Sequence, residues 1–252
     1  MADDITGPMD HGSATPDRTG EAPHPSLRDT FTEIYASGVW TPAGETGSAR
    51  HPESSSGVGS NLTQTAALRA ALPALMTGLG VRTLLDIPCG DFFWMSQLDL
   101  GVERYTGADI VPGLIDRNRE RFARTDREFR LIDLTRDPLP RVDLVFSRDC
   151  LVHLGDDDIH RALDNIRSSG STYLATTTFT ERAENPDDIA AGGWRPLNLQ
   201  RPPFALPPPF RLINERCTEI YVTEENGIRI EHRFEDKSIG VWRIADLQAT
   251  PR

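Results

Sequence analysis

Carboxylates stand at the ends of two strand-like apolar runs, with a glycine between them. The run 81–87 leads into the turn Asp86-Ile-Pro-Cys-Gly-Asp91, and the next run, 104–110, ends at Asp109. Gly90 has no Cβ, so the backbone of this turn could come close to a ligand. Asp109 could accept hydrogen bonds from both hydroxyl groups of a ribose. The spacing is typical of the first two strands of an open α/β sheet that binds a nucleoside cofactor.

The turn also indicates which kind of cofactor the sheet would bind. A dinucleotide site has the pattern G-x-G-x-x-G, which lets a pyrophosphate rest on a helix N-terminus. This turn has a single glycine, and its flanking carboxylates would repel a pyrophosphate and suit a cationic or zwitterionic ligand. From about Gly57 to its C-terminus, the chain resembles the class I S-adenosylmethionine-dependent methyltransferases, in the subgroup whose first motif is D-x-P-C-G-D.

The resemblance implies that one group of residues binds the amino acid end of S-adenosylmethionine. Asp86 and Gly90 would contact this portion, and Asp91 would bind its ammonium group. Trp94 would cover the same end, although it could equally be a core residue. The segment Ser56-Gly-Val-Gly-Ser60 would fold over the cofactor carboxylate through backbone N–H groups and Ser60, although its composition also fits a flexible linker.

A second group follows the adenosine end of the cofactor. By the resemblance, Asp109 binds the ribose and Ile110 packs on the adenine face. Asp133, expected to close the third strand, would accept a hydrogen bond from the exocyclic amine, and Leu134 would line the adenine pocket. The alternative for Asp109 and Asp133 is an acid that simply ends a strand.

Three polar residues follow the fourth expected strand, at the mouth of this cofactor site. Arg148, Asp149 and His153 lie within one short stretch, which is unusual for a purely structural role. Methyl transfer is an in-line displacement that depends on positioning, and a hydroxyl acceptor also needs a base. We assign His153 as the first candidate base and Asp149 as the second. His153 could instead be a packing or capping residue.

The role of Arg148 is open between three contacts. We assign it to cofactor binding, but it could also clamp an anionic substrate or pair with a neighbouring acid. Cys150 is more consistent with the core than with a nucleophile, because methyl transfer needs no covalent intermediate.

The acceptor is expected to bind between an N-terminal helical lid, residues 26–80, and a long loop, residues 181–210. The loop is rich in proline and has no helical period, and loops of this length tend to be functional or disordered. An inert surface excursion or a dimer contact is the alternative. Glu184, Asp187 and Asp188 would admit a cationic acceptor, whereas Arg148 and Arg195 would admit an anionic one. The expected substrate-binding residues are Tyr35, Trp40, Asp187, Trp194, Arg195 and Asn198.

Strands that alternate with helices position these motifs. We expect an α/β fold with a Rossmann-like, seven-stranded, mostly parallel sheet, an antiparallel C-terminal edge pair and helices on both faces. The segment Glu224-Glu-Asn-Gly227 is a hairpin signal. Helices are expected over 26–35, 61–79, 92–98, 112–122 and 156–168. Strands are expected over 81–87, 104–110, 129–134, 142–147, 172–179, 212–222, 228–234 and 238–244.

Composition limits the remaining possibilities. The chain has 252 residues and a net charge of −11, which argues against nucleic acid or an anionic membrane as the main partner. Residues 1–25 are expected to be a disordered leader and 26–252 a single domain, cytoplasmic by default, as a monomer or homodimer. The three cysteines and the His and Asp spacings suggest no disulfide framework or metal site. The sole lysine, Lys237, is attributed to genomic base composition rather than to chemistry.

These features favour an S-adenosylmethionine-dependent methyltransferase. The acceptor would be an oxygen or nitrogen atom of a small molecule, such as a sugar, an amino-acid-derived compound or another specialised metabolite. Two alternatives are a non-catalytic protein that binds the cofactor and a protein partner, and a nicotinamide-dependent oxidoreductase. The lack of G-x-G-x-x-G argues against the oxidoreductase, and the cluster at residues 148–153 argues against the non-catalytic protein.

Overall fold

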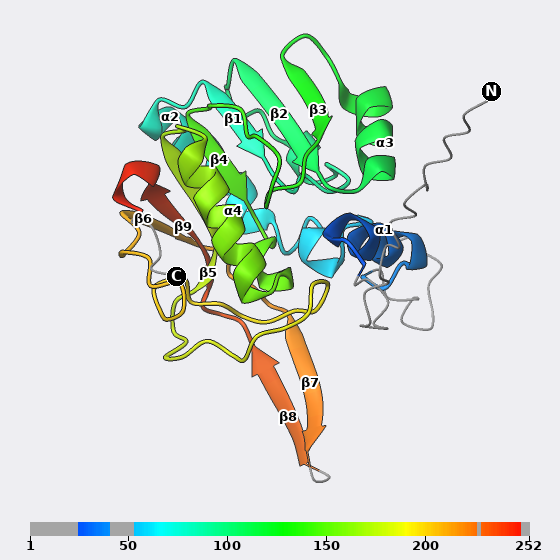
Figure 1. The fold of residues 1–252 in the computed structure, drawn as a ribbon, viewed down its shortest axis with the longest axis vertical. Coiled ribbons are helices and arrows are strands. Elements are labelled where there is room, and N and C mark those ends of the chain that lie inside the picture. Colours follow the sequence, from blue (N-terminus) through cyan, green and yellow to red (C-terminus); the bar gives the residue numbers. More distant parts are fainter. Residues whose placement is uncertain (1–24, 41–52, 226–227, 248–252) are drawn as a thin grey trace, which may run out of the picture.

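The computed structural model describes residues 25–40, 53–225 and 228–247, and a seven-stranded sheet forms its centre (Figure 1). The strands lie in the order β3-β2-β1-β4-β5-β9-β6. Their bounds are β1 Thr83–Asp86, β2 Arg104–Asp109, β3 Arg127–Leu131, β4 Leu144–Ser147, β5 Tyr173–Phe179, β6 Arg211–Asn214 and β9 Lys237–Arg243. Strands β1 to β5 run parallel, and β9 runs antiparallel to both of its neighbours, β5 and β6. The predicted Rossmann-like architecture is confirmed.

Helices cover both faces of the sheet, as predicted. Successive strand residues point to opposite faces, so Leu84 packs with Leu72 of α2 (Ala66–Leu79), whereas Leu85 packs with Leu163 of α4 (Asp156–Ser168). Helix α3 (Pro112–Phe122) joins the α2 side through Ile115. Helix α2 continues through Pro73 as a single helix.

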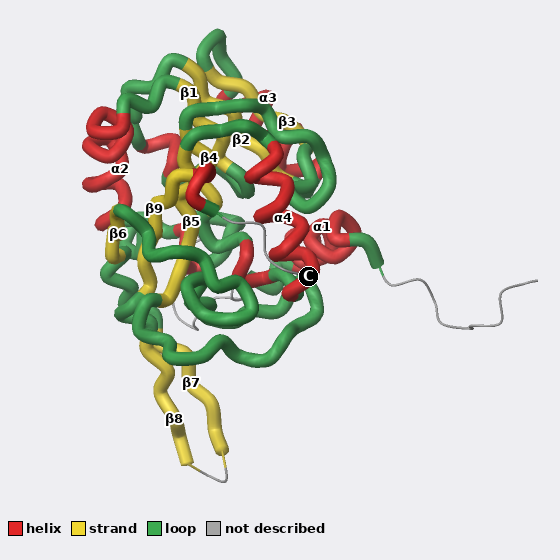
Figure 2. The backbone as a smooth tube through the Cα atoms, turned by 60° about the vertical axis from the view of Figure 1, so that its left-hand side comes forward, coloured by secondary structure: helices red, strands yellow, loops and turns green. Residues whose placement is uncertain are grey.

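The antiparallel edge is formed by different segments from those expected. The predicted strand 212–222 divides into β6 and β7 (Ile220–Glu225), and β7 pairs with β8 (Ile228–Arg233) in a separate two-stranded sheet. The division follows from a turn, because Asn214 Oδ1 accepts a hydrogen bond from the N–H of Arg216, whose φ is +54°. The edge pair of the main sheet is therefore β9 and β6, while the β7–β8 hairpin projects from the body (Figures 1 and 2).

Two other elements are shorter than predicted. The expected helix 92–98 is reduced to a single 3₁₀ turn, Met95–Gln97. Asp91 Oδ1 accepts a hydrogen bond from the N–H of Phe93, and Phe92 has a φ of +59°, so the chain turns where a helix would begin. Strand β3 ends at Leu131, which leaves Asp133 in the following turn rather than at a strand end.

The long loop after β5 is partly core. Leu197, Leu199, Phe204 and Leu206 are buried and pack in the same cluster as α4. The second half of this loop therefore covers the sheet face beside α4.

Helix α1 (Leu27–Ser37), expected over 26–35, begins after a capping box formed by Ser26 and Asp29. The predicted leader, residues 1–25, lies outside the described residues except for Pro25, and the predicted lid falls outside them at 41–52.

Candidate functional site

A cavity of about 260 Å³ opens at the carboxyl ends of β1, β2 and β4, close to the size range of small-molecule sites. Ligands in open α/β sheets bind at this end of the strands. Thirteen of the eighteen predicted site residues line the cavity: Tyr35, Trp40, Ser60, Asp86, Gly90, Asp91, Trp94, Asp109, Ile110, Arg148, Asp149, His153 and Trp194. Residues from α1, from the carboxyl ends of β1, β2 and β4, and from the long loop thus meet in one place.

The turn after β1 is held by its neighbours. Gly90 has a φ of +54°, and its N–H donates to Asp109 Oδ2 at 3.0 Å. Asp109 Oδ1 accepts the N–H of Val111, also at 3.0 Å. Asn118 on α3 donates to the Gly90 carbonyl at 2.8 Å. Each carboxylate oxygen of Asp109 keeps a lone pair, so this residue can orient the turn and still accept from a ribose.

Two buried carboxylates with raised pKa values lie side by side at this end of the sheet. Burial raises the pKa of Asp109 to about 6, against the opposing effect of its backbone hydrogen bonds. Burial raises the pKa of Asp86 to about 7, and the hydroxyl of Tyr105 donates to its Oδ2. Hydroxyl or ammonium donors from a ligand would stabilise the charged form of both groups.

Asp91 and the N-terminal segment bind each other. The Asp91 carboxylate accepts hydrogen bonds from the N–H and hydroxyl of Ser55 and from the hydroxyl of Ser54. In return, the Asp91 N–H donates to Ser56 Oγ at 2.9 Å, and Tyr35 donates to the same oxygen at 3.1 Å. Asp91 thus anchors the segment predicted to cover the cofactor, a contact that the sequence did not indicate.

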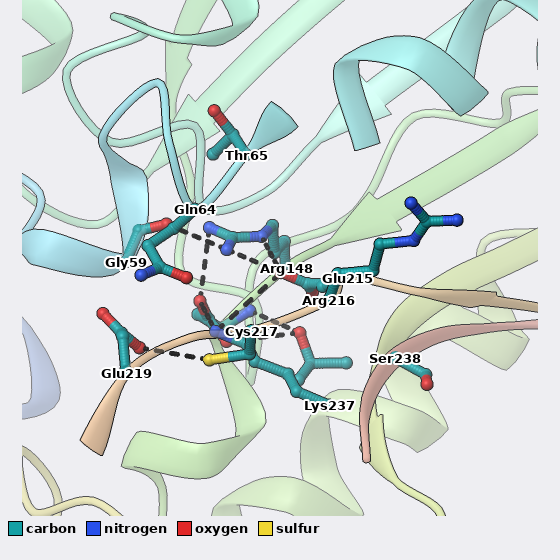
Figure 3. Close-up of polar contacts among 12 residues, drawn as sticks. Gly59, Gln64, Thr65, Arg148, Glu215, Arg216, Cys217, Glu219, Lys237 and Ser238 are labelled. Atoms are coloured by element: carbon teal, nitrogen blue, oxygen red, sulfur yellow. Dashed lines mark hydrogen bonds and ion pairs between the residues drawn. The ribbon is translucent and has the colours of Figure 1, made fainter. Parts of the chain in front are cut away.

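A buried ionic cluster closes the side of the cavity next to β9. Arg148 pairs with Glu215 at 2.7 Å and with Asp149 at 3.2 Å, and it donates to the Gly59 carbonyl (Figure 3). Lys237 pairs with Asp149 at 2.7 Å and lies 3.9 Å from Glu215. Attributing Lys237 to base composition alone is therefore wrong in structural terms, because the sole lysine lines the site and is 5% exposed.

These ion pairs argue against Asp149 as the base. Burial alone would raise its pKa, but Arg148 and Lys237 outweigh burial and hold the pKa of Asp149 well below its usual range. A carboxylate with so low a pKa is a weak proton acceptor. Of the three contacts considered for Arg148, the pairing with neighbouring acids is the one observed. The guanidinium also lies over the ring of Trp94, 5.7 Å from its centroid.

His153 has the arrangement of a base. Its Nδ1 lies 2.7 Å from the carbonyl oxygen of Gly193, which can only accept, so Nδ1 carries the proton and Nε2 has the free lone pair. Burial lowers the pKa of His153, which keeps the ring neutral near pH 7. Trp40 lies against the ring at a centroid distance of 4.7 Å.

Five predicted residues do not line the cavity. The buried guanidinium of Arg195 binds Asp156, Asp188 and the carbonyl of Leu154, and so fastens the long loop to the start of α4. Asn198 is buried and donates to carbonyls within the same loop. The structure corrects the prediction that Arg195 and Asn198 bind the substrate, because both side chains hold the loop together and neither lines the cavity. The remaining three are Asp133, Leu134 and Asp187.

Asp133 has partners of its own. One carboxylate oxygen accepts hydrogen bonds from the N–H and hydroxyl of Thr135, and the other pairs with Arg136 at 2.9 Å. The binding of adenine by Asp133 and Leu134 therefore stays a prediction from resemblance.

Other lining residues were missed by sequence reasoning. Glu219 follows the β6 break, and Lys237 begins β9, so neither stands in a motif. Phe31 could have been found from its helical spacing with Tyr35 on α1. In the described part of the chain, no group of three or more His, Cys, Asp or Glu side chains could hold a metal ion. The helices there are also too short or too polar to cross a membrane.

The residues present fit an adenosyl amino acid with a sulfonium centre. A ligand can come close to the backbone at Gly90, and the carboxylate of Asp109 can accept hydrogen bonds from ligand hydroxyl groups. The carboxylates of the cavity suit a cationic ligand. Fold and site together define an open α/β domain that binds a nucleoside cofactor at the ends of β1 and β2.

Comparison with known proteins specifies this class. Residues 84–169 match the family model described as "Methyltransferase domain". The matched segment, which runs from β1 through α4, is therefore similar in sequence to a methyltransferase domain and lies on an open α/β sheet. The match argues against the oxidoreductase alternative.

Solved structures resemble the chain at low sequence identity. The N-methyltransferase NodS from Bradyrhizobium japonicum WM9 has a TM-score of 0.49 and 14% identity, covering 74% of this chain and 98% of that one. Magnesium protoporphyrin IX methyltransferase from Synechocystis PCC 6803 has a TM-score of 0.48 and 10% identity, with 88% and 99% coverage. Human N-acetylserotonin methyltransferase has a TM-score of 0.44 and 14% identity, covering 69% of this chain but 51% of the human enzyme. No curated protein sequence matched the chain.

Proposed function

We propose that this chain transfers the methyl group of S-adenosylmethionine to an oxygen or nitrogen atom of a small-molecule acceptor, with His153 as the base. The acceptor would be a sugar, an amino-acid-derived compound or another specialised metabolite. The observation that carries the proposal is one cavity lined both by the cofactor motif around Gly90 and Asp109 and by a neutral histidine. The net charge of −11 disfavours nucleic acid as the acceptor.

Each part of the chain has a separate task in this mechanism. When bound, S-adenosylmethionine supplies a methyl group on a sulfonium sulfur. Asp109 would hold the nucleoside end, whereas the Gly90 turn and the segment that ends at Ser60 would hold the amino acid end. Trp40 and Trp194 line the side from which an acceptor would approach. His153 Nε2 takes the proton that the acceptor loses, while its Nδ1–H stays on the Gly193 carbonyl.

Calorimetric titration with S-adenosylmethionine and with S-adenosylhomocysteine tests the cofactor half of the proposal. We expect both to bind, and we expect Asp109→Ala to weaken binding by about tenfold or more. Asp116→Ala is a matched control, because Asp116 is exposed on α3 and outside the cavity. The proposal is contradicted if Asp109→Ala binds as tightly as the unmodified protein. It is also contradicted if the unmodified protein binds neither compound.

Acceptors are then screened by the release of S-adenosylhomocysteine. The double variant Asp149→Asn with His153→Ala separates catalysis from the non-catalytic alternative. If a cellular phenotype survives this double change but is lost in Asp109→Ala, cofactor binding without methyl transfer is the function.

A further inference from the structure

The charged side chains around Arg148 do not balance. Two cations, Arg148 and Lys237, face three carboxylates, those of Asp149, Glu215 and Glu219. The ion pairs match Arg148 and Lys237 with Asp149 and Glu215. Glu219 is therefore the surplus charge, and it lines the cavity. Figure 3 shows its side chain beside Cys217.

Glu219 has spare hydrogen-bonding capacity at a buried atom. Its Oε1 is buried and has no hydrogen-bond partner among the residues that the structure describes. Its Oε2 accepts the weak S–H donor of Cys217 at 3.7 Å. A Cβ at Gly59 would lie 3.6 Å from Glu219 Oε1, so the carboxylate packs against the backbone that covers the cofactor. A buried carboxylate oxygen without a donor is costly, and a donor on a ligand would relieve that cost.

Glu219 also stands where two cavities meet. Besides the cofactor cavity, it lines a second cavity of about 370 Å³ at the base of the β7–β8 hairpin, together with Asn214, Arg216 and Arg233. A ligand group bound to Glu219 would lie at the wall of the cofactor cavity, and the rest of the ligand would have room in the second cavity.

The cations beside the cofactor cavity are already used. Arg195 is buried against α4, outside the cavity, and Arg148 and Lys237 are paired. The aromatic rings of Trp40 and Trp194 line the same cavity, and such rings attract cations through their faces. Arg216 and Arg233 line the second cavity, so it is the walls of the cofactor cavity that favour a positively charged group of the acceptor over a negatively charged one.

We infer that Glu219 binds the amino group of the acceptor, which makes the acceptor a primary or secondary amine. This inference rests on the proposed methyltransferase function. The bound ammonium group gives one proton to His153 Nε2, and its freed lone pair forms the new nitrogen–carbon bond. The sulfur–carbon bond breaks, its electron pair stays on sulfur, and S-adenosylhomocysteine and the methylated amine leave.

The test uses the full chain saturated with S-adenosylhomocysteine, so that the cofactor site is filled. A panel of aryl and alkyl amines, such as phenethylamine, is titrated by calorimetry beside matched alcohols, such as 2-phenylethanol. We expect at least one amine to bind about tenfold more tightly than its alcohol. Glu219→Gln should abolish this preference, and Glu219→Asp, which keeps the charge, should retain it in part. Glu235→Gln, at an exposed position that lines the second cavity alone, should leave the preference intact.

Affinity for S-adenosylhomocysteine separates the two proposals. If S-adenosylhomocysteine does not bind, the proposed function fails. If it binds but no amine in the panel is preferred, this inference alone is overturned. It is also overturned if Glu219→Gln keeps the amine preference, or if it weakens S-adenosylhomocysteine binding instead. A thermal melt of each variant establishes that it is folded before it is titrated.

Discussion

At the scale of single residues, the proposed role of His153 as the base can be measured, because its Nε2 is free and burial lowers its pKa. We expect His153→Gln to lower turnover by about 10²–10⁴-fold. The unmodified enzyme should lose activity as the pH falls through the lowered pKa of His153, because the protonated ring cannot accept a proton. Above that pKa the rate should level off. Initial rates of S-adenosylhomocysteine release across pH measure this, and a variant with an unchanged acid limb would contradict the assignment.

From the raised pKa of Asp109 we expect cofactor binding, rather than the catalytic step, to depend on pH. Its pKa of about 6 in the free protein means that the carboxylate becomes protonated as the pH falls through that value. A ribose donates hydrogen bonds to the charged form, so affinity for S-adenosylhomocysteine should fall on the acid side and be level above it. Titration calorimetry over this pH range is the measurement. Asp109→Asn should bind weakly at every pH and lack the transition, and a variant with the same transition would show that another group titrates.

Residues could be predicted where a motif and a strand end coincide. Asp86, Gly90 and Asp109 line the cavity because the carboxyl ends of parallel strands meet at one edge of the sheet. Lys237 and Glu219 lie far away in sequence, and their place in the site depends on the pairing of β9 and on the break after β6. No local pattern encodes that pairing, so the sole lysine could not be distinguished from a compositional accident.

At the scale of elements, the turn after β1 and the N-terminal segment must fit each other closely. A Cβ at Gly90 would overlap Ser56 Oγ, so Gly90→Ala should push this segment off the turn. We expect affinity for S-adenosylhomocysteine to fall by about tenfold or more. Gly101→Ala is the matched control, because its φ of +64° imposes similar backbone strain while nothing lies within 4 Å of the added Cβ. Equal effects in the two variants would attribute the loss to backbone strain and refute the steric explanation.

The elements that the sequence misassigned share a physical reason. The loop 181–210 has prolines and no period, which predicted a loop that binds the acceptor but gave no sign that four of its apolar residues pack beside α4. Burial of an irregular segment depends on buried polar anchors such as Arg195 and Asn198, whose role appears only with their partners. The strand expected over 212–222 is divided because the Asn214 side chain bonds the N–H of Arg216 and turns the chain.

At the scale of the whole molecule, the strand order was within reach of the sequence because helices and strands alternate along it. The hairpin β7–β8 was also signalled by its turn, but its place was not, since nothing in its sequence says that it leaves the main sheet. Figure 2 shows it standing away from the body. Ile220, Tyr221 and Val222 are 46%, 61% and 41% exposed, and no side chain described within the hairpin is buried.

A hairpin with so little packing should contribute little to the stability of the fold, since an isolated two-stranded hairpin is marginal in water. Tyr221 and His232 are register partners, so replacing residues 222–231 by Asn-Gly would join them through a two-residue turn. We expect the melting temperature to change by about 2 °C or less, with S-adenosylhomocysteine affinity unchanged. Calorimetry and gel filtration are run on the trimmed and unmodified chains together. A large fall in melting temperature that accompanies a shift from dimer to monomer would contradict the prediction, because a second copy would then be holding the exposed apolar strand.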